Sequence, residues 1–297
     1  MNVVETGEEQ TCGVECGDRP KSGRIAEAYP NVRRAILLNC FGRGGSSIMW
    51  NMIGSSPDVL MPSGEWHEAF YGRWPIVGRA LRRVTRPTGL NVPALRPLSW
   101  LVRKRAFSSV PQDELRNKPR ATSIVLKLMD HHIAMNSAIA ASFPEASQVV
   151  LVRNPLAQCE SFLRSGLNLK EATARYTEVM GRLITLAARS DTFVYRFDDL
   201  VRNPFAARDD LYDRLSISVS SCGSFKMKHK KFGEDRTPAV RRAIGPYVDV
   251  TPQNVSELID KDVNKRSVLR LSDEQRAFIW QETNEVASYF HYAPWTA

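Results

Sequence analysis

Apolar positions along the chain fall into short dense runs, separated by longer stretches in which apolar residues recur every three or four positions. The dense runs have the length of strands that are buried on both faces. They predict five strands, at residues 34–40, 58–61, 123–129, 147–154 and 191–197. The spaced pattern predicts helices that begin near residues 46 and 136 or that cover residues 155–163, 171–189 and 272–290.

Strands that alternate with helices predict an α/β fold of three layers, in which helices cover both faces of a central, mainly parallel sheet. Ligands of such sheets bind at the carboxyl ends of the strands. Residues 42–47, 130–132 and 153–155 each follow a predicted strand. We therefore expect these three segments to meet at one edge of the sheet.

The chain of 297 residues is long enough to bury a large core. We expect a flexible, polar leader at residues 1–30 and a single domain over residues 31–297. Residues 221–270 are rich in Lys and Arg and are predicted to be irregular. Ser272 and Gln275, three positions apart, predict a capping box at the start of the last helix.

The lengths of the apolar stretches and the number and spacing of the cysteines predict the compartment and the metal content. No apolar stretch approaches the ~20 residues that cross a bilayer, so no membrane span is expected. Five cysteines, an odd number spread over the chain, do not suggest a disulfide framework and fit a reducing compartment. We expect a cytoplasmic protein. Cys12 and Cys16 have no two further ligands nearby, and no metal site is expected. The pattern predicts no particular oligomeric state.

The formal net charge of +9 is concentrated in a basic insertion at about residues 69–120. No acidic residue lies between Glu68 and Asp113, a stretch that contains Arg73, Arg79, Arg82, Arg83, Arg86, Arg96, Arg103, Lys104 and Arg105. Such a segment can bind nucleic acid or an anionic membrane, attract an anionic small ligand, or form a solvated basic face. Its prolines and tryptophans favour a partly irregular insertion that covers a cleft.

The first predicted strand leads into residues 42–47, GRGGSS, which we call the glycine turn. Glycines let such a turn bring several backbone N–H groups to one point, and the following helix N-terminus adds a partial positive charge. This predicts an anion site, most often for phosphate. A plain strand-to-helix connection uses the same residue types. A P-loop has lysine after its last glycine, whereas Ser46 follows Gly45 here, which disfavours an ordinary nucleoside triphosphatase.

A second element, VVLVRNPLAQCESFLRSG at residues 149–166, ends a buried strand with Arg153 and reaches Ser161 two helical turns later. Arg153 supplies a fixed cation and Ser161 a hydroxyl donor, so both can face one anion. Together with the glycine turn, this element resembles the sulfotransferase family that uses 3′-phosphoadenosine 5′-phosphosulfate (PAPS). VYRFDDLVRNP at 194–204 and LSDEQRAFIWQETNEVASYFHY at 271–292 are similar to further segments of that family.

The resemblance covers roughly residues 33–292 and implies the P-loop-like sulfotransferase fold. It implies that the 5′-phosphosulfate end of PAPS is bound by Arg43, Gly44, Gly45, Ser46 and Ser47. It also implies that Arg153 and Ser161 bind the 3′-phosphate. Arg241 and Arg242 resemble, more loosely, a basic pair that the family carries near its C-terminus.

Sulfuryl transfer requires in-line positioning, neutralisation of charge on the leaving phosphate, and a base for the acceptor proton. Arg43 suits the leaving-group role because guanidinium is permanently charged, and Lys127 can share it. Phe197 replaces the tyrosine of the family's Y-E-D segment, so any role of that hydroxyl is lost.

The base is left open among four residues. Glu65 lies where glycan-modifying members of the family place a catalytic glutamate, and Glu68 is its neighbouring alternative. His131 and His132 follow the third strand, near where phenol-modifying members carry a catalytic histidine. Histidine is poised for base work at neutral pH, whereas glutamate needs an apolar pocket that raises its pKa.

The resemblance predicts an enzyme that moves a sulfuryl group from PAPS to a hydroxyl or amine of a soluble small molecule, such as a secondary metabolite. The product would be adenosine 3′,5′-bisphosphate, and neither a metal nor a nucleic-acid partner is expected. Three alternatives stay open. They are a carbohydrate or glycolipid sulfotransferase, a P-loop-type kinase, and a non-catalytic basic binding module.

Overall fold

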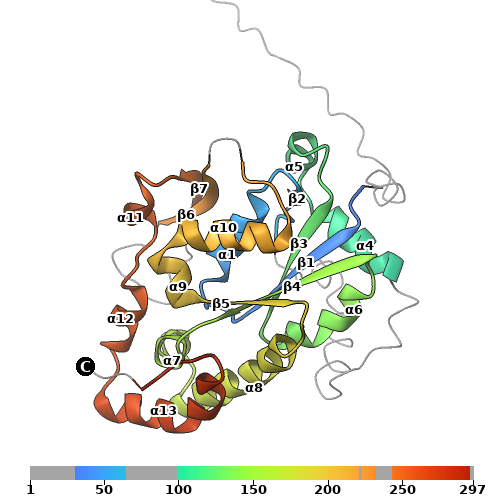
Figure 1. Ribbon diagram of the computed structural model, residues 1–297. Helices are drawn as coiled ribbons and strands as arrows, with labels where there is room; N and C mark the ends of the chain where they lie inside the picture. Colours follow the sequence, from blue (N-terminus) through green and yellow to red (C-terminus); the bar gives the residue numbers. More distant parts are fainter. Residues whose placement is uncertain (1–30, 65–98, 221–222, 232–242, 295–297) are drawn as a thin grey trace, which may run out of the picture.

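A computed structural model describes residues 31–64, 99–220, 223–231 and 243–294. Its centre is a five-stranded sheet in which all neighbouring strands are parallel (Figure 1). In spatial order, the strands are β2 (Val59–Leu60), β3 (Ser123–Met129), β1 (Arg34–Cys40), β4 (Glu145–Val152) and β5 (Thr192–Arg196). The predicted parallel sheet is confirmed, and its strand bounds lie close to the predicted ones.

Successive side chains of a strand point to opposite sides of the sheet, so each buried strand supplies apolar side chains to both faces. Helices cover both of these faces. In β1, Ala35 and Leu37 pack into one apolar cluster, and Ile36 and Leu38 pack into the other. The first cluster is closed by α4 (Ser99–Ser108), α6 (Asn136–Ala140), α7 (Pro155–Leu163), α8 (Leu169–Ala187) and α13 (Asp273–Ser288). The second is closed by α1 (Ser46–Gly54), α9 (Phe197–Arg202), α10 (Pro204–Leu215) and a hairpin of β6 (Phe225–Lys231) with β7 (Ala243–Val250). This is the predicted three-layer α/β architecture.

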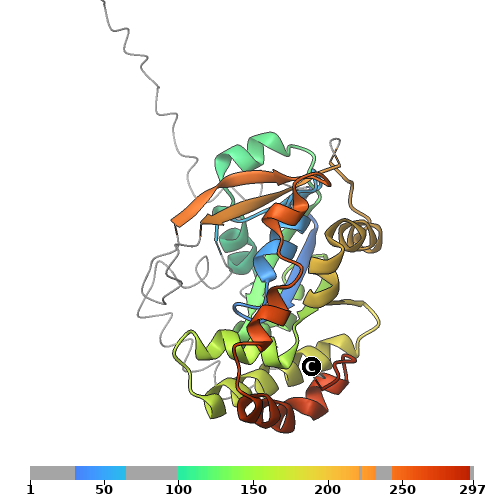
Figure 2. The ribbon, with the colours of Figure 1, turned by 90° about the vertical axis from the view of Figure 1, so that its left-hand side faces the viewer.

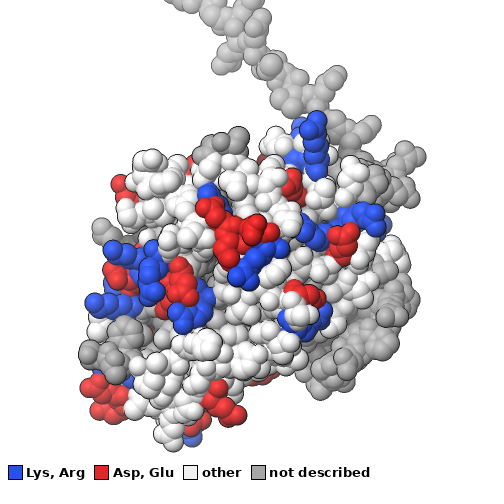
Figure 3. All heavy atoms as spheres, viewed as in Figure 1, with Lys and Arg blue, Asp and Glu red and all other residues white. Residues whose placement is uncertain are grey.

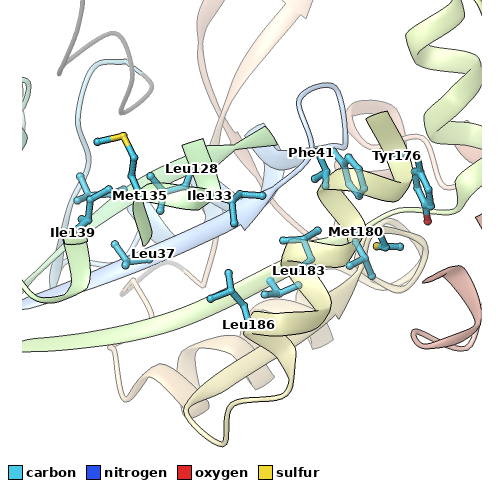
Figure 4. Packing of buried hydrophobic residues seen from close by; sticks show 14 of the residues in the cluster. Leu37, Phe41, Leu128, Ile133, Met135, Ile139, Tyr176, Met180, Leu183 and Leu186 are labelled. Atoms are coloured by element: carbon cyan, nitrogen blue, oxygen red, sulfur yellow. The ribbon is translucent and has the colours of Figure 1, made fainter. Parts of the chain in front are cut away.

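The first cluster anchors the end of β1 (Figure 4). Phe41 stacks its ring on Tyr176 of α8, with ring centroids 5.1 Å apart and planes inclined by 7°. Leu37 and Leu183 are fully buried in the same cluster. Burial of each such side chain contributes about 1.5–3 kcal/mol. The residue directly before the glycine turn, Phe41, is therefore firmly packed.

The region at residues 221–270 differs from its prediction, because its described part contains regular elements. The hairpin β6–β7 is followed by α11 (Val255–Leu258) and α12 (Val263–Val268). In β6, Phe225 and Met227 are buried while Lys226 between them is exposed. In the sequence this alternation of apolar residue and lysine covers only residues 225–228, which is too short a run to stand out in a Lys-rich stretch.

The described part of the basic insertion is helical. Its residues 99–117 contain α4 and α5 (Gln112–Asn117), and most of the Pro- and Trp-rich stretch that the sequence predicts to be partly irregular precedes them. In α4, buried Val102, Ala106 and Phe107 lie on one side of the helix. The rest of the insertion, residues 69–98, lies outside the described residues.

Two helix starts follow the expected capping chemistry. Ser272 and Gln275 form the predicted capping box at α13, which is confirmed. Asn168 and Glu171 form a second box at α8. From the hairpin, α11 and α12 run along the outside of the molecule to α13, which lies beside α8 (Figures 1 and 2).

Charges on the face seen in Figure 3 are mixed, with acidic and basic side chains next to one another. Ion pairs of the chain include Arg196–Asp199 and Arg214–Asp210. Within the described ranges, no helix is long and apolar enough to span a membrane.

Candidate functional site

The glycine turn contains two residues with positive φ. Gly45 caps α1 with φ +80°, in the left-handed region. A Cβ at Gly45 would lie 1.9 Å from Cε2 of the Phe197 ring, so glycine is required both for its φ and for space. Arg43 also has positive φ, +62°, which is uncommon for a residue with a side chain and marks local strain.

Two side chains brace the start of the turn. The N–H of Gly42 donates to Oδ1 of Asp130 at 3.0 Å, and Nε2 of Gln158 donates to the carbonyl of Gly42 at 3.0 Å. Asp130 opens the short helix η2 (Asp130–Met135) after β3 and also forms an ion pair with Arg175 of α8. The ends of β1, β3 and β4 therefore meet, as expected from the parallel topology.

Arg153, directly after β4, is a deeply buried cation of this edge, with only 5% of its surface exposed. Its Nε donates to Oδ1 of Asn264 at 2.7 Å, and its Nη1 donates to the carbonyl of Arg43 at 2.8 Å. Its guanidinium carbon lies 5.0 Å from the centroid of the Phe197 ring. Burial lowers the pKa of Arg153 to about 10, which still leaves the group charged at neutral pH.

The contacts of Arg153 leave its charge without a direct counter-ion. Among the residues that the structure describes, no carboxylate oxygen comes within 4.0 Å of its nitrogens, and no acceptor hydrogen-bonds to Nη2. A buried cation surrounded by neutral partners is costly for a protein to maintain. Such a group is suited to a site that receives an anionic ligand.

Arg43 contacts both Arg153 and Ser161. Nε of Arg43 donates to Oγ of Ser161 at 3.0 Å, and Ser161 is itself buried on α7. The turn after β4 is rigid because Asn154 caps α7, accepting from the N–H groups of Leu156 and Ala157. The structure thus brings the three predicted phosphate-binding side chains together.

Lys127 lies on the opposite face of the sheet from α7, under α1. It is 5% exposed, and its Nζ lies 4.9 Å from the centroid of the Trp50 ring. Two residues further along β3, Sδ of Met129 contacts Oγ of Ser46 at 3.8 Å. The end of β3 therefore adjoins the N-terminus of α1, which places Lys127 close to the glycine turn.

The candidate bases are placed only in part. His132 is buried in η2, with Nδ1 3.2 Å from the carbonyl of Met129. His131 belongs to the same short helix, but its side chain lies outside the described residues. Glu65 and Glu68 lie outside the described residues as well.

The C-terminal basic pair, Arg241 and Arg242, also lies outside the described residues. Groups of three or more His, Cys, Asp or Glu side chains that could hold a metal do not occur in the described part of the chain.

Sequence reasoning overlooks two residues of this site. Phe197 is singled out only as a lost hydroxyl, yet its ring packs between Gly45 and the guanidinium of Arg153. Asn264 carries no sequence signal at all, because an asparagine in a charged, 50-residue stretch is unremarkable without knowledge of the fold. The only local hint for Phe197 is its place directly after the last strand, at the functional edge of the sheet.

Comparison with known proteins agrees with this geometry. Residues 36–221 match the family described as the sulfotransferase family. The sulfotransferase domain from the curacin biosynthetic pathway is 18% identical, with 87% of this chain and 97% of that chain covered and a TM-score of 0.54. The sulfotransferase domain from the olefin synthase of Synechococcus PCC 7002 is 17% identical, with 88% and 95% covered and a TM-score of 0.54. At these identities the two structures establish the fold. Comparison with curated proteins gives no match.

Proposed function

The chain belongs to the sulfotransferase family, and from this premise we propose that it transfers a sulfuryl group from PAPS to a hydroxyl or amine of a small-molecule acceptor. The second product is adenosine 3′,5′-bisphosphate. The observation that carries the proposal is the buried guanidinium of Arg153, whose hydrogen-bond partners among the described residues are all neutral, at the edge where the glycine turn ends.

Two groups of residues fit the two charged ends of PAPS. The glycine turn, at the N-terminus of α1, fits the 5′-phosphosulfate end, and Arg153 with Ser161 fits the 3′-phosphate. Arg43 belongs to both groups, because its carbonyl accepts from Arg153 and its guanidinium donates to Ser161. When bound, PAPS supplies an activated sulfuryl group, whose sulfur–oxygen bond to phosphate breaks as the acceptor attacks sulfur.

The protein's part in this step is electrostatic. Backbone N–H groups of the glycine turn, with Arg43 and Lys127, would neutralise the charge that develops on the leaving phosphate. These groups are fixed before the reaction by the contacts around Gly42 and Trp50. Little reorganisation is then needed while the bond breaks.

The acceptor proton passes to a base, for which Glu65, Glu68, His131 and His132 are the candidates. In neutral His132, a proton on Nδ1 would be donated to the carbonyl of Met129, which leaves Nε2 as the basic nitrogen. Replacement of each candidate by alanine, with turnover measured across pH, identifies the one whose loss removes the ascending limb of the rate profile.

An acceptor panel tests the proposal. The purified protein is incubated with PAPS and phenols, alcohols, amines or free sugars, and release of adenosine 3′,5′-bisphosphate is followed. Release that depends on a small-molecule acceptor supports the proposal, and release with sugars alone supports the carbohydrate alternative. Transfer from ATP with Mg²⁺, but not from PAPS, contradicts it.

A further inference from the structure

A chain of hydrogen bonds connects the C-terminal part of the protein to the glycine turn. The hydroxyl of Tyr292 donates to Oδ2 of Asp198 at 3.0 Å, and Nδ2 of Asn264 donates to Oδ1 of Asp198 at 2.8 Å. Nε of Arg153 then donates to Oδ1 of Asn264 at 2.7 Å, and Nη1 donates to the carbonyl of Arg43 at 2.8 Å. Asn264 and Tyr292 are both buried.

The side chain of Asn264 is matched to its two neighbours. A guanidinium only donates hydrogen bonds, and a carboxylate only accepts them. An amide between them can satisfy both when its oxygen faces Arg153 and its nitrogen faces Asp198, which is the orientation in the structure. A carboxylate at this position could not donate to Asp198, and an apolar side chain could do neither.

The amide also separates two opposite charges. Asp198 is the carboxylate that most raises the pKa of Arg153, against the lowering by burial, yet it does not contact the guanidinium. Direct pairing of Asp198 with Arg153 would satisfy the cation inside the protein and leave less of its charge for a ligand. With Asn264 between them, the guanidinium is held in place while Nη2 keeps its hydrogen-bonding capacity.

We propose that Asn264 is a positioning residue, which orients Arg153 toward the 3′-phosphate of the bound nucleotide and prevents Asp198 from neutralising it. The proposal rests on the proposed function, because it assumes a 3′-phosphorylated nucleotide. Asn264 belongs to α12, which runs along the outside of the molecule (Figures 1 and 2). Under this proposal, α12 therefore contributes to nucleotide selection.

The test compares two nucleotides, adenosine 3′,5′-bisphosphate and adenosine 5′-monophosphate, by calorimetric titration. The ratio of their dissociation constants reports what the protein gains from the 3′-phosphate. A hydrogen bond to a charged group is worth roughly 1.5–3 kcal/mol, so Asn264→Ala is expected to reduce this ratio about 10- to 100-fold. Affinity for the monophosphate should change little, because that ligand lacks the group that Arg153 binds.

Two further variants and a control complete the design. Asn264→Asp fills the same volume but places a carboxylate against Arg153, and it should also reduce the ratio. Tyr292→Phe removes one bond to Asp198 and should reduce it less. Asn254→Ala is the matched control, since Asn254 uses both amide atoms in hydrogen bonds to Thr251 and Asp249 but does not contact Arg153.

The outcomes separate the inference from the function on which it rests. A wild-type protein that does not prefer the bisphosphate contradicts the proposed function. A wild-type preference that survives in Asn264→Asp, or an equal loss of affinity for both nucleotides, overturns the positioning role alone. If Asn264→Ala does not fold, the isosteric Asn264→Asp decides.

Discussion

The two turns at the functional edge are built by different means. The glycine turn after β1 depends on backbone conformation, with Gly45 held against the ring of Phe197 and Gly42 braced by Asp130. The turn after β4 depends on one side chain, Arg153, which is held by partners from distant parts of the chain. The first should therefore fail through steric clash, and the second through loss of charge or of orientation.

Gly45→Ala should have the largest effect on the glycine turn. The new Cβ would meet the Phe197 ring at 1.9 Å in a backbone conformation unfavourable for alanine. Overpacking of this kind typically costs about 1–3 kcal/mol, to which the strain of positive φ adds about 1 kcal/mol. Urea unfolding measures the change. A companion double variant with Phe197→Ala should recover part of the loss, and strict additivity would contradict the predicted clash.

Asp130→Ala should have the next largest effect. It removes the acceptor of the Gly42 N–H and the ion-pair partner of Arg175. A buried donor that loses its acceptor costs about 1–3 kcal/mol, so the free energy of unfolding should fall by that amount. Asp130→Asn keeps a carbonyl oxygen for Gly42 and should lose less. Equal losses for the two variants would show that the ion pair, and not the bracing of the turn, matters.

Phe197→Leu tests the contact that both turns share. The guanidinium of Arg153 loses an aromatic face, which is worth roughly 0.5–2 kcal/mol. Affinity for adenosine 3′,5′-bisphosphate should fall about 2- to 30-fold. The free energy of unfolding should fall as well, because the ring is also buried in the second apolar cluster. Unchanged affinity in a folded variant would mean that the ring supports the glycine turn alone.

Cys159→Ser should have the smallest effect. Thiol labelling of Cys159 reports on the packing of α7 against α8. Burial raises the pKa of its thiol to about 12, so hardly any thiolate exists at pH 8. Labelling of the native protein with a thiol reagent should therefore give the same number of reactive groups in wild type and in Cys159→Ser. The unfolded proteins should differ by one group. Rapid labelling of native Cys159 would contradict the tight packing of α7 against α8.

The glycine turn is the part of the site that the sequence predicts well. An apolar run, a cluster of glycines and a helix start are neighbours in sequence, so local rules suffice to place them. The capping box of α13 is predicted for the same reason. The β6–β7 hairpin is missed because the apolar alternation of β6 covers only residues 225–228 before a run of basic residues begins.

The partners of Arg153 could not be predicted in this way. Asn264 lies 111 positions further along the chain, and only tertiary packing brings the two together. The surroundings of Phe197 likewise depend on how β5 and β1 lie in the sheet. The roles of Glu65, Glu68, Arg241 and Arg242 stay predictions, since these residues lie outside the described part of the structure.

The central claim is that Arg153 holds a charge without a direct counter-ion for a 3′-phosphorylated nucleotide. Calorimetric titration of adenosine 3′,5′-bisphosphate into the wild-type protein and into folded Arg153→Ala tests it most directly. We expect binding by the wild type and a loss of affinity of about 100-fold or more in the variant, as for loss of a charged partner worth about 3 kcal/mol. Equal affinity in the two proteins, or no binding by a folded wild type, would contradict the account.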